Sequence, residues 1–354
     1  MTLPYFDTEA INKLGEYIDH CKANHKSIVV LCDSHTLNYC LPVLEKYSPP
    51  HFINKVLSIP FGEENKNLDT VVSLWEQLFD NNIHRDTLLI SLGGGIVCDL
   101  GGFTAATFKR GISSVLVPTS LMAQVDAAIG GKTGFNFRQA KNQIGFFCHP
   151  DNIFIIPEFL KTLPERDILS GFTEMLKHGL IADASYWNEL IKISSPLQMI
   201  QPKWIKRSID IKTKICITDP YEQNERKKLN FGHTIGHALE SYFMAETHPL
   251  SHGEAIALGI ITEAHISFQK GLISENELTS ISDILQRLFS TLTVKEINTS
   301  SLFYYLQKDK KKTNENRNFT LLNSIGNTLI NQLVTEQEIM LSLECLDKVF
   351  HNRQ

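Results

Sequence analysis

The sequence has no excess of basic residues and no long apolar run. Lys plus Arg number 34 against 39 Asp plus Glu, which gives a formal net charge of −5 and a pI near 6.2. This balance argues against binding to nucleic acid or to an anionic membrane surface, because both usually require a basic excess. Since no run of about 18 consecutive apolar residues occurs, no membrane span is expected.

The sequence also has few cysteines, no C-x-x-C pair, no internal repeat and no Gly/Ser-rich linker. Its seven cysteines are an odd number, and they predict reduced, mostly buried thiols of a cytoplasmic protein. The first residues lack the basic-then-apolar pattern of a secretory signal, which agrees with a cytoplasmic location. With 354 residues, 42% of them hydrophobic, the chain is long enough for two or three domains with a sizeable core.

Short apolar runs rich in β-branched residues alternate with helical patterns in the first part of the chain. The expected strands are residues 27–31, 51–59, 87–92, 114–118 and 153–156. Between the second and third runs, Val71, Leu74 and Leu78 have helical spacing. Asp33 and Ser34 follow the first run and form a helix N-cap signal. Continuous apolar strands separated by helices predict a parallel sheet that is covered on both faces.

After Pro157 the β-branched runs stop and apolar residues recur every three or four positions. This spacing predicts helices at residues 171–181, 204–217, 232–243 and 254–268. We therefore expect an α/β fold with an N-terminal Rossmann-like parallel-sheet domain (residues 1–158) and a C-terminal all-helical domain (residues 159–354). A cofactor is expected at the carboxyl ends of the sheet strands.

Three glycine-containing segments could approach an anion. Residues 93–95 are three glycines after an apolar strand, and they fit either a phosphate-binding turn or a plain tight turn. Residues 60–66 contain acids that could accept hydrogen bonds from ribose hydroxyls, although solvated loop charge is the simpler interpretation. Residues 124–145 place Lys132, Lys141 and Asn142 among glycines, which suits an anion contact or a solvated loop.

Histidines and one glutamate indicate a metal site. His233 and His237 lie one helical turn apart on one face, and His252 follows within a short segment. Glu174 stands earlier, among apolar positions. Two or three histidines with one carboxylate suit Zn²⁺ with an open coordination position, although 13 histidines make chance pairs easy. His178, His248 and His265 are interpreted as structural or surface residues.

Several segments together make the chain similar to the 3-dehydroquinate synthase family, within the sugar-phosphate cyclase group. The resemblance covers about residues 62–326. Its segments are GGGIVCDLGGFTAATFKRG, VPTSLMAQVDAAIGGKTGFN, KNQIGFF, LKTLPER, GFTEMLKHGLI, ERKKLNFGHTIGHALE, LSHGEAIALG and DKK, in the family's order and at close to its spacing.

The resemblance implies a homodimer that binds NAD⁺ in its N-terminal domain and Zn²⁺, or Co²⁺, in its C-terminal domain. The family's metal ligands fall on Glu174, His233 and His252. His237, which spacing alone would make a ligand, matches a substrate-contacting position instead. Arg110 matches an arginine that reaches the neighbouring subunit's phosphate site. The three-ligand set leaves the open position that catalytic zinc needs.

The resemblance also assigns cofactor and substrate contacts. The implied NAD contacts are Gly62, Glu63, Lys66, Gly95, Ile96, Val97, Cys98, Asp99, Thr119, Ser120, Lys132, Lys141, Phe159, Leu160, Lys161 and Thr162. The implied substrate contacts are Asp126, Lys132, Asn142, Lys177, Lys212, Arg226, Asn230, His237 and Lys310. The lysine-rich loop at residues 308–312 leaves open which lysine makes the last of these contacts. Phe61 stands where the family usually has an aspartate, which weakens the ribose-side assignment.

The implied reaction converts 3-deoxy-D-arabino-heptulosonate 7-phosphate to 3-dehydroquinate and phosphate, in the shikimate pathway to the aromatic amino acids. NAD⁺ takes a hydride and returns it within one turnover, so that no net redox change appears. The substrate carries a carboxylate and a phosphate, and we expect seven cations to converge on it: Arg110, Lys132, Lys141, Lys177, Lys212, Arg226 and Lys310. Without an anion, such a group would repel itself.

There are four alternatives to this activity. Other cyclases of the group use sugar phosphates without a carboxylate, and Arg226 argues against them because arginine binds a carboxylate at two points. An aminodehydroquinate synthase would share all of these residues. A metal-dependent polyol dehydrogenase of the same fold has a neutral substrate and would accumulate NADH. An inactive relative that serves as a binding module is disfavoured because the implied metal and phosphate residues are all present.

Overall fold

The computed structural model describes residues 1–138, 140–244, 249–292, 297–308, 312–313 and 316–351. The chain forms two compact units. Unit 1 comprises residues 1–168 and 200–217, and unit 2 comprises residues 169–199 and the chain from residue 218 onward. The first division falls within helix α6 (Glu165–Ala182). The domain boundary expected after residue 158 lies ten residues before this division, and it stays a prediction.

Unit 1 contains a six-stranded sheet in which every neighbouring pair is parallel, as the apolar runs predict. In spatial order its strands are β1 (Pro4–Phe6), β8 (Asn152–Ile155), β5 (Ser113–Pro118), β4 (Leu88–Gly93), β2 (Ile28–Asp33) and β3 (Lys55–Ile59). The strand expected from His51 starts only at Lys55. His51 has a left-handed φ of 54°, and the Asn54 side chain accepts the Ile28 N–H at 2.7 Å. The edge strand β1 is not predicted by the pattern.

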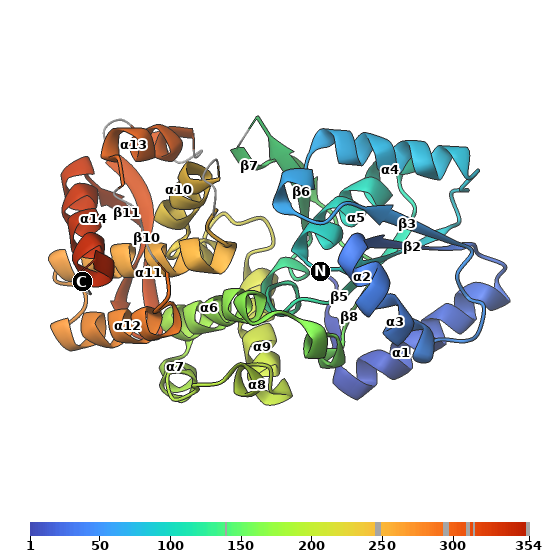
Figure 1. The fold of residues 1–354 in the computed structure, drawn as a ribbon, viewed down its shortest axis with the longest axis horizontal. Helices are drawn as coiled ribbons and strands as arrows, with labels where there is room; N and C mark the ends of the chain where they lie inside the picture. Colours follow the sequence, from blue (N-terminus) through green and yellow to red (C-terminus); the bar gives the residue numbers. More distant parts are fainter. Residues whose placement is uncertain (139, 245–248, 293–296, 309–311, 314–315, 352–354) are drawn as a thin grey trace. The chain divides into compact units, whose positions relative to one another are not determined.

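Helices cover both faces of this sheet, because successive residues of a strand point to opposite sides. Ile28 and Val30 pack with helix α1 (Asp7–Ala23) and with α3 (Leu41–Lys46). Val29 and Leu31 pack with α4 (Leu68–Asp80) and α5 (Gly95–Thr107) on the other face (Figure 1). Burying a side chain of this size contributes about 2 kcal/mol. The short helix α2 (Ser34–Tyr39) starts at the expected Asp33 cap.

An antiparallel ribbon in unit 1 covers much of the segment, residues 124–145, expected to form an anion contact or a solvated loop. It consists of β6 (Lys132–Phe137) and β7 (Ala140–Phe147), and Gly134 faces Gly145 across it. A Cβ atom on Gly134 would lie 2.3 Å from the Ile144 carbonyl oxygen, so the glycines allow two backbones to approach. The other elements that concern the site are η1 (Glu63–Asn65), the π-helical turn η3 (Ala123–Ala127), η4 (Pro157–Thr162) and most of α9 (Pro202–Thr218).

Unit 2 is mainly helical, as expected. Besides part of α6 it contains η5 (Glu225–Asn230), α7 (Ala184–Leu190), α8 (Pro196–Met199), α10 (His233–Phe243), α11 (His252–Gln269), α12 (Glu275–Leu288), α13 (Thr299–Lys308) and α14 (Glu336–His351). Helix α11 is buried on all sides and packs against α10, α12 and α14 (Figure 1). Among the described helices, none is both long and apolar enough to cross a membrane.

Unit 2 also contains a small antiparallel sheet that the all-helical expectation leaves out. Its strands are β9 (Lys312–Thr313), β10 (Asn316–Ser324) and β11 (Asn327–Val334). A tight turn joins β10 to β11, and Gly326 in this turn has a φ of +91°. In β10 the successive residues Phe319, Thr320, Leu321 and Leu322 are all buried, so the strand lacks the alternation of buried and exposed residues that is typical of a half-buried strand. The hydrophobic pattern of the sequence therefore does not identify β10 as a strand.

Candidate active site

The glycine turn after β4 leads directly into helix α5. The N-cap residue of α5 is Gly94, which has no side chain that could cap the helix. No side chain therefore covers the backbone N–H groups of the first turn at this position. Such a helix start suits an anion such as a pyrophosphate. Thr119 and Ser120 follow the neighbouring strand β5, and the Thr119 N–H donates to the Gly93 carbonyl at 2.9 Å. The implied cofactor residues of both strands therefore meet at one edge of the sheet.

A connected polar cluster lies beside this turn within unit 1. The Lys66 ammonium, on a side chain that is almost completely buried, donates to the Asp99 carboxylate at 2.5 Å and to the Asn142 amide oxygen at 2.7 Å. Lys141 pairs with Glu63 at 3.1 Å. Burial raises the pKa of Asp99, and the Lys66 charge opposes that rise. Five residues that the resemblance assigns to cofactor or substrate are thus joined in one cluster.

Asn136 connects the two halves of this cluster, and the sequence analysis does not identify it. Its amide donates to Glu63 at 2.8 Å, and its side-chain oxygen accepts the Asn142 N–H at 3.0 Å. Asn142 has a left-handed φ of 50°, a conformation that asparagine tolerates better than most residues. Asn136 lies on β6, opposite the strand that carries Asn142, but no spacing rule pairs them across the ribbon.

The other implied residues of unit 1 are more dispersed. Asp126, on the π-helical turn η3, forms an ion pair with buried Lys212 of α9. Lys132 is exposed at the start of β6, and Arg110 is exposed with a left-handed φ of 64°. The Phe159 side chain packs into the sheet core. In the same stretch Leu160 is buried, whereas Lys161 and Thr162 are exposed.

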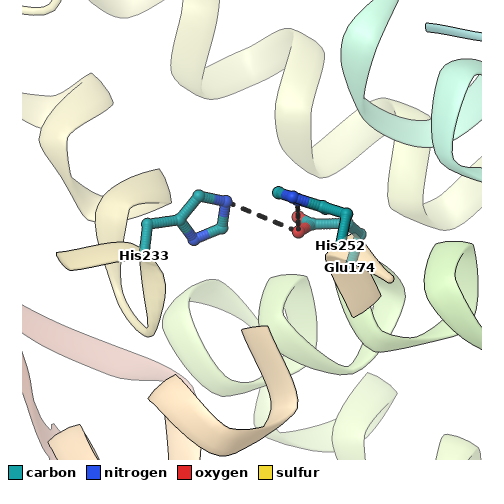
Figure 2. Close-up of side chains that lie close together, drawn as sticks. All are labelled: Glu174, His233 and His252. Atoms are coloured by element: carbon teal, nitrogen blue, oxygen red, sulfur yellow. Dashed lines mark ion pairs between the residues drawn. The ribbon is translucent and has the colours of Figure 1, made fainter. Parts of the chain in front are cut away.

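Unit 2 brings Glu174, His233 and His252 together from three helices (Figure 2). Glu174 is completely buried on α6, His233 is the first residue of α10, and His252 is the first residue of α11. The Nε2 atoms of both histidines lie 3.5 Å from Glu174 Oε1. A tetrahedral ion with bonds of about 2.1 Å holds its ligand atoms about 3.4 Å apart. The three side chains therefore fit a Zn²⁺-type ion with an open position.

Helix α10 starts at His233 because two features hold its first turn. Gly232 adopts a left-handed φ of 78°, and a Cβ atom there would lie 2.5 Å from Ile260 Cγ1 of α11. The completely buried Glu263 of α11 accepts the N–H groups of Gly232 at 2.7 Å and Ile235 at 3.0 Å. A carboxylate at a helix N-terminus satisfies donors that have no partner within the helix.

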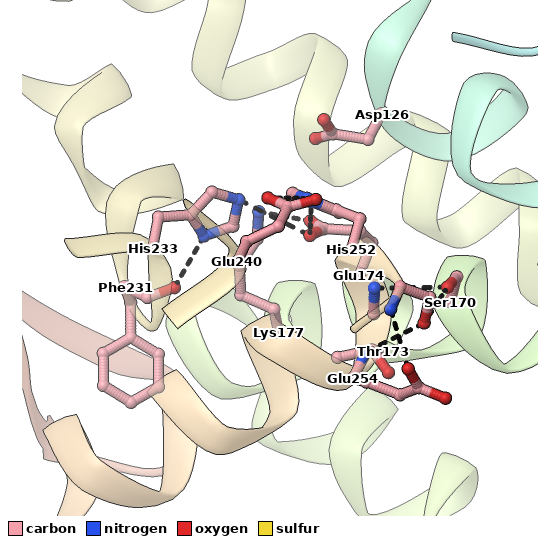
Figure 3. Close-up of polar contacts among 12 residues, drawn as sticks. Asp126, Ser170, Thr173, Glu174, Lys177, Phe231, His233, Glu240, His252 and Glu254 are labelled. Carbon is pink, nitrogen blue, oxygen red and sulfur yellow. Dashed lines mark hydrogen bonds and ion pairs between the residues drawn. The ribbon is translucent and has the colours of Figure 1, made fainter. Parts of the chain in front are cut away.

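Helix α11 starts at His252 through a capping box. Ser251 accepts the Glu254 N–H at 3.3 Å, and the Glu254 carboxylate accepts the Ser251 N–H at 2.7 Å. Ser170 of α6 accepts the Gly253 N–H at 3.1 Å, and a Cβ atom on Gly253 would lie 2.2 Å from the Ser170 Cα atom (Figure 3). Close contact between α6 and α11 therefore fixes where His252 lies relative to the Glu174 helix.

The two histidines have opposite pKa shifts. Burial lowers the pKa of His233 well below its usual value, and the nearby Lys177 charge lowers it further. Burial also acts to lower the pKa of His252, but Glu240 and Glu174 outweigh it and raise the pKa to about 9. His233 is therefore ready to bind a metal as neutral imidazole, whereas His252 must release a proton first.

His237 and Lys177 lie beside this centre. The His237 ring centroid is 5.1 Å from that of His233 and 5.9 Å from that of His252. His237 groups with Glu240 and His252, whose ligand atoms lie within 4.8 Å of one another. Among the described residues, His233 and His237 do not belong to one such group, although their spacing suggests it. Lys177 forms an ion pair with Glu174 one helical turn away.

Arg226 and Asn230 lie on η5, directly before α10. Arg226 is 2% exposed and donates to the Pro220 carbonyl at 2.7 Å, and its backbone N–H donates to Asp219 at 3.1 Å. Asn230 donates to Glu222 at 2.7 Å. Lys310 lies outside the described residues.

Three of the seven cations expected around the substrate are paired with carboxylates, and so is Lys66 of the expected cofactor site. Four site lysines each form an ion pair with a carboxylate of the same unit: Lys66 with Asp99, Lys141 with Glu63, Lys177 with Glu174, and Lys212 with Asp126. Because each carboxylate offsets the charge of its lysine, the four cations repel one another less before any anion is bound.

Models of one protein family match both halves of the chain. The model described as 3-dehydroquinate synthase N-terminal matches residues 56–170, and the model described as 3-dehydroquinate synthase C-terminal matches residues 171–312. A 3-dehydroquinate synthase of Parabacteroides distasonis is 37% identical over 94% of this chain and 94% of its own length. A 3-dehydroquinate synthase of Latilactobacillus sakei is 38% identical over 84% of this chain and 83% of its own length.

Two solved structures of sugar-phosphate cyclases are similar to the whole chain. The 2-epi-5-epi-valiolone synthase of Streptomyces hygroscopicus, with NAD⁺ and Zn²⁺ bound, has a TM-score of 0.83 and 26% identity, and the match covers 91% of each chain. A 2-deoxy-scyllo-inosose synthase with carbaglucose-6-phosphate, NAD⁺ and Co²⁺ has a TM-score of 0.83 and 25% identity, over 96% of this chain and 95% of its own. Glycerol dehydrogenase of Schizosaccharomyces pombe, at 15% identity and a TM-score of 0.65, shares the fold.

Proposed function

The chain belongs to the 3-dehydroquinate synthase family, and on that basis we propose that it converts 3-deoxy-D-arabino-heptulosonate 7-phosphate to 3-dehydroquinate and phosphate. It is a phosphate-eliminating lyase of the shikimate pathway to the aromatic amino acids. Its cofactors are NAD⁺ and a divalent metal ion, Zn²⁺ or Co²⁺. One observation carries the proposal most directly: in a chain whose residues 56–312 match the family's models, two imidazole nitrogens each lie 3.5 Å from one buried carboxylate oxygen.

The metal would be held by Glu174, His233 and His252. The dinucleotide would lie along the strand ends of unit 1, with its pyrophosphate on the bare turn before α5 and its ribose near Glu63 and Lys66. When bound, NAD⁺ supplies a hydride acceptor and donor, and the metal supplies a Lewis acid for a substrate oxygen. The residues themselves orient the substrate and place charge around it.

The substrate would be held at both of its anionic ends. The Arg226 guanidinium is held by its hydrogen bond to the Pro220 carbonyl, while the backbone of Arg226 is held by Asp219; the guanidinium would bind the carboxylate at two points. The remaining contacts proposed for the substrate are Lys132, Asn142, Asp126, Lys177, Lys212, Asn230, His237 and Lys310. Lys177 and Lys212 each form an ion pair, with Glu174 and Asp126 respectively, which holds both amines in place.

The decisive experiment incubates the protein with the heptulosonate phosphate, NAD⁺ and Zn²⁺, and measures inorganic phosphate and 3-dehydroquinate in the same sample. Equal amounts of both products are expected. Phosphate without 3-dehydroquinate would indicate a different cyclase product, and neither product would reject the proposal. A Glu174→Ala variant serves as the matched control, because it should lose both the bound metal and the reaction.

The same assay separates the alternatives. A polyol dehydrogenase of this fold would accumulate NADH with a polyol, whereas a cyclase returns the hydride and accumulates none. The amino analogue of the substrate, supplied in competition, tests for an aminodehydroquinate synthase. We further propose a cytoplasmic homodimer in which Arg110 reaches the partner's phosphate site, with an NAD-binding domain over residues 1–158 and a metal- and substrate-binding domain over residues 159–354. Mass measurement in solution tests the dimer, and kcat/KM of Arg110→Ala for the heptulosonate phosphate tests this role of Arg110.

A further inference from the structure

The imidazole of His252 lies between two buried carboxylates. Its Nε2 atom is 3.5 Å from Glu174 Oε1, and its Nδ1 atom is 3.3 Å from Glu240 Oε2. Glu240 is 5% exposed and lies on α10, the helix that also begins with His233. Figure 3 shows both glutamates beside His252. One ring thus contacts a proposed metal ligand through one nitrogen and a second glutamate through the other.

This arrangement decides which nitrogen of His252 is left to bind a metal once the ring is neutral. A carboxylate accepts hydrogen bonds, so contact with Glu240 places the proton on Nδ1 and leaves Nε2 able to bind a metal. His233 is oriented in the same way, because its Nδ1 atom lies 3.1 Å from the Phe231 carbonyl oxygen. The backbone orients one histidine, and the Glu240 side chain orients the other.

We propose that Glu240 is a positioning residue for His252: it holds the ring and its tautomer so that Nε2 points to the metal. The inference rests on the metal site of the proposed function. Glu240 acts through His252 and is not itself one of the three ligands. Hydrogen bonding to a carboxylate also makes the imidazole a stronger donor, so removal of such a partner typically weakens metal binding by about 10- to 100-fold.

The test measures Zn²⁺ affinity by competition with a chelator, and the absorption spectrum of the Co²⁺-loaded protein. Glu240→Ala should bind Zn²⁺ about 100-fold more weakly than wild type, and Glu240→Gln, which keeps an acceptor oxygen, about 10-fold more weakly. Both variants should shift the Co²⁺ bands, because the ring turns relative to the ion. Glu277→Gln is the control: this glutamate of unit 2 accepts the N–H groups of Ser274 at 2.9 Å and Ile325 at 3.0 Å. It should leave affinity and spectrum unchanged.

The outcomes separate this inference from the proposed function. Wild-type affinity and spectrum in the Glu240 variants would overturn the role of Glu240 while leaving the metal site intact. If the wild-type protein binds neither Zn²⁺ nor Co²⁺, the metal site and the inference fall together. Should Glu240→Ala not fold, Glu240→Gln decides alone, and an unchanged affinity then overturns the inference.

Discussion

The Nζ atom of Lys66 lies 2.5 Å from the Oδ2 atom of Asp99, and this ion pair joins the loop after β3 to the first turns of α5. Both partners are largely buried, at 7% and 18% side-chain exposure. Removing one partner of such a pair leaves a charge without compensation, whereas replacing both by uncharged groups removes that penalty. Lys66 thus supports the cofactor edge of the sheet in the absence of NAD⁺.

Lys66→Met should destabilise the protein by about 3 kcal/mol, because the Asp99 carboxylate stays buried without its cation. The double variant Lys66→Met/Asp99→Asn should recover most of that loss. Urea unfolding of wild type, both single variants and the double variant measures the coupling between the two positions. Additive effects of the single changes would show that the pair does not act as a unit.

Arg226→Ala should lower kcat/KM for the heptulosonate phosphate by 100-fold or more, a loss of roughly 3 kcal/mol, if Arg226 binds the carboxylate. Lys228→Ala is the matched control on the same short helix. Lys228 pairs with Glu225 at a partly exposed site, and such pairs contribute about 0.5 kcal/mol or less. Steady-state kinetics of both variants provides the comparison, and near-normal kinetics in Arg226→Ala would reject carboxylate recognition there.

Gly232→Ala should cost more stability than Gly271→Ala, although both glycines have left-handed φ values, of 78° and 68°. Alanine at either position costs about 1–2 kcal/mol for its conformation. At Gly271 nothing lies within 4 Å of the added Cβ atom, whereas at Gly232 it would meet Ile260 at 2.5 Å.

The two glycine variants should also differ in metal binding. Gly232 directly precedes His233, so a displaced α10 should weaken Zn²⁺ binding, while Gly271→Ala should not affect it. Thermal unfolding with and without Zn²⁺ tests both parts. Equal losses of stability in the two variants would contradict the steric argument.

Asp219 should make stability depend on pH. Burial acts to raise the pKa of its carboxyl, but the N–H groups of Asn224, Gln223 and Arg226 outweigh burial and hold the pKa below its usual value. A depressed folded-state pKa adds stability above the unfolded pKa of about 3.9, and that stability is lost as the pH falls through the folded-state value. Asp219→Asn should therefore be less stable than wild type at neutral pH, with the difference shrinking below about pH 4. Chemical unfolding at several pH values measures it, and a difference independent of pH would exclude this origin.

The sheet of unit 1 was predictable because its central strands are continuous apolar runs. Ile28 to Leu31 are completely buried, so no polar residue interrupts the pattern. The ribbon β6–β7 was not predictable, since glycines and polar residues at its pairing positions are equally typical of a loop. The small sheet of unit 2 was missed because the pairing of β10 with β11 is interrupted by shifts in register. Such shifts break the regular alternation by which a strand is identified in a sequence.

The site was predictable only in part from spacing. The i, i+4 rule places His233 and His237 side by side on one helix, and the two rings are indeed close, at 5.1 Å. Which histidine faces Glu174 depends on contacts between α6, α10 and α11, and no local pattern encodes these. Glu240 lies seven residues after His233 and therefore on the same helical face, so its position near the centre could have been inferred. Its contact with His252 requires the fold.

Strand β1 pairs with β8 at the edge of the six-stranded sheet, and Thr2 donates to the Pro150 carbonyl at 2.6 Å. During synthesis the amino-terminal residues leave the ribosome long before their partners exist. Strand β8, the partner of β1, is the last strand of the sheet to be synthesised, so β1 can pair only after the other strands have been made. Until β1 pairs with it, β8 has an open backbone edge to which a strand of another chain could add.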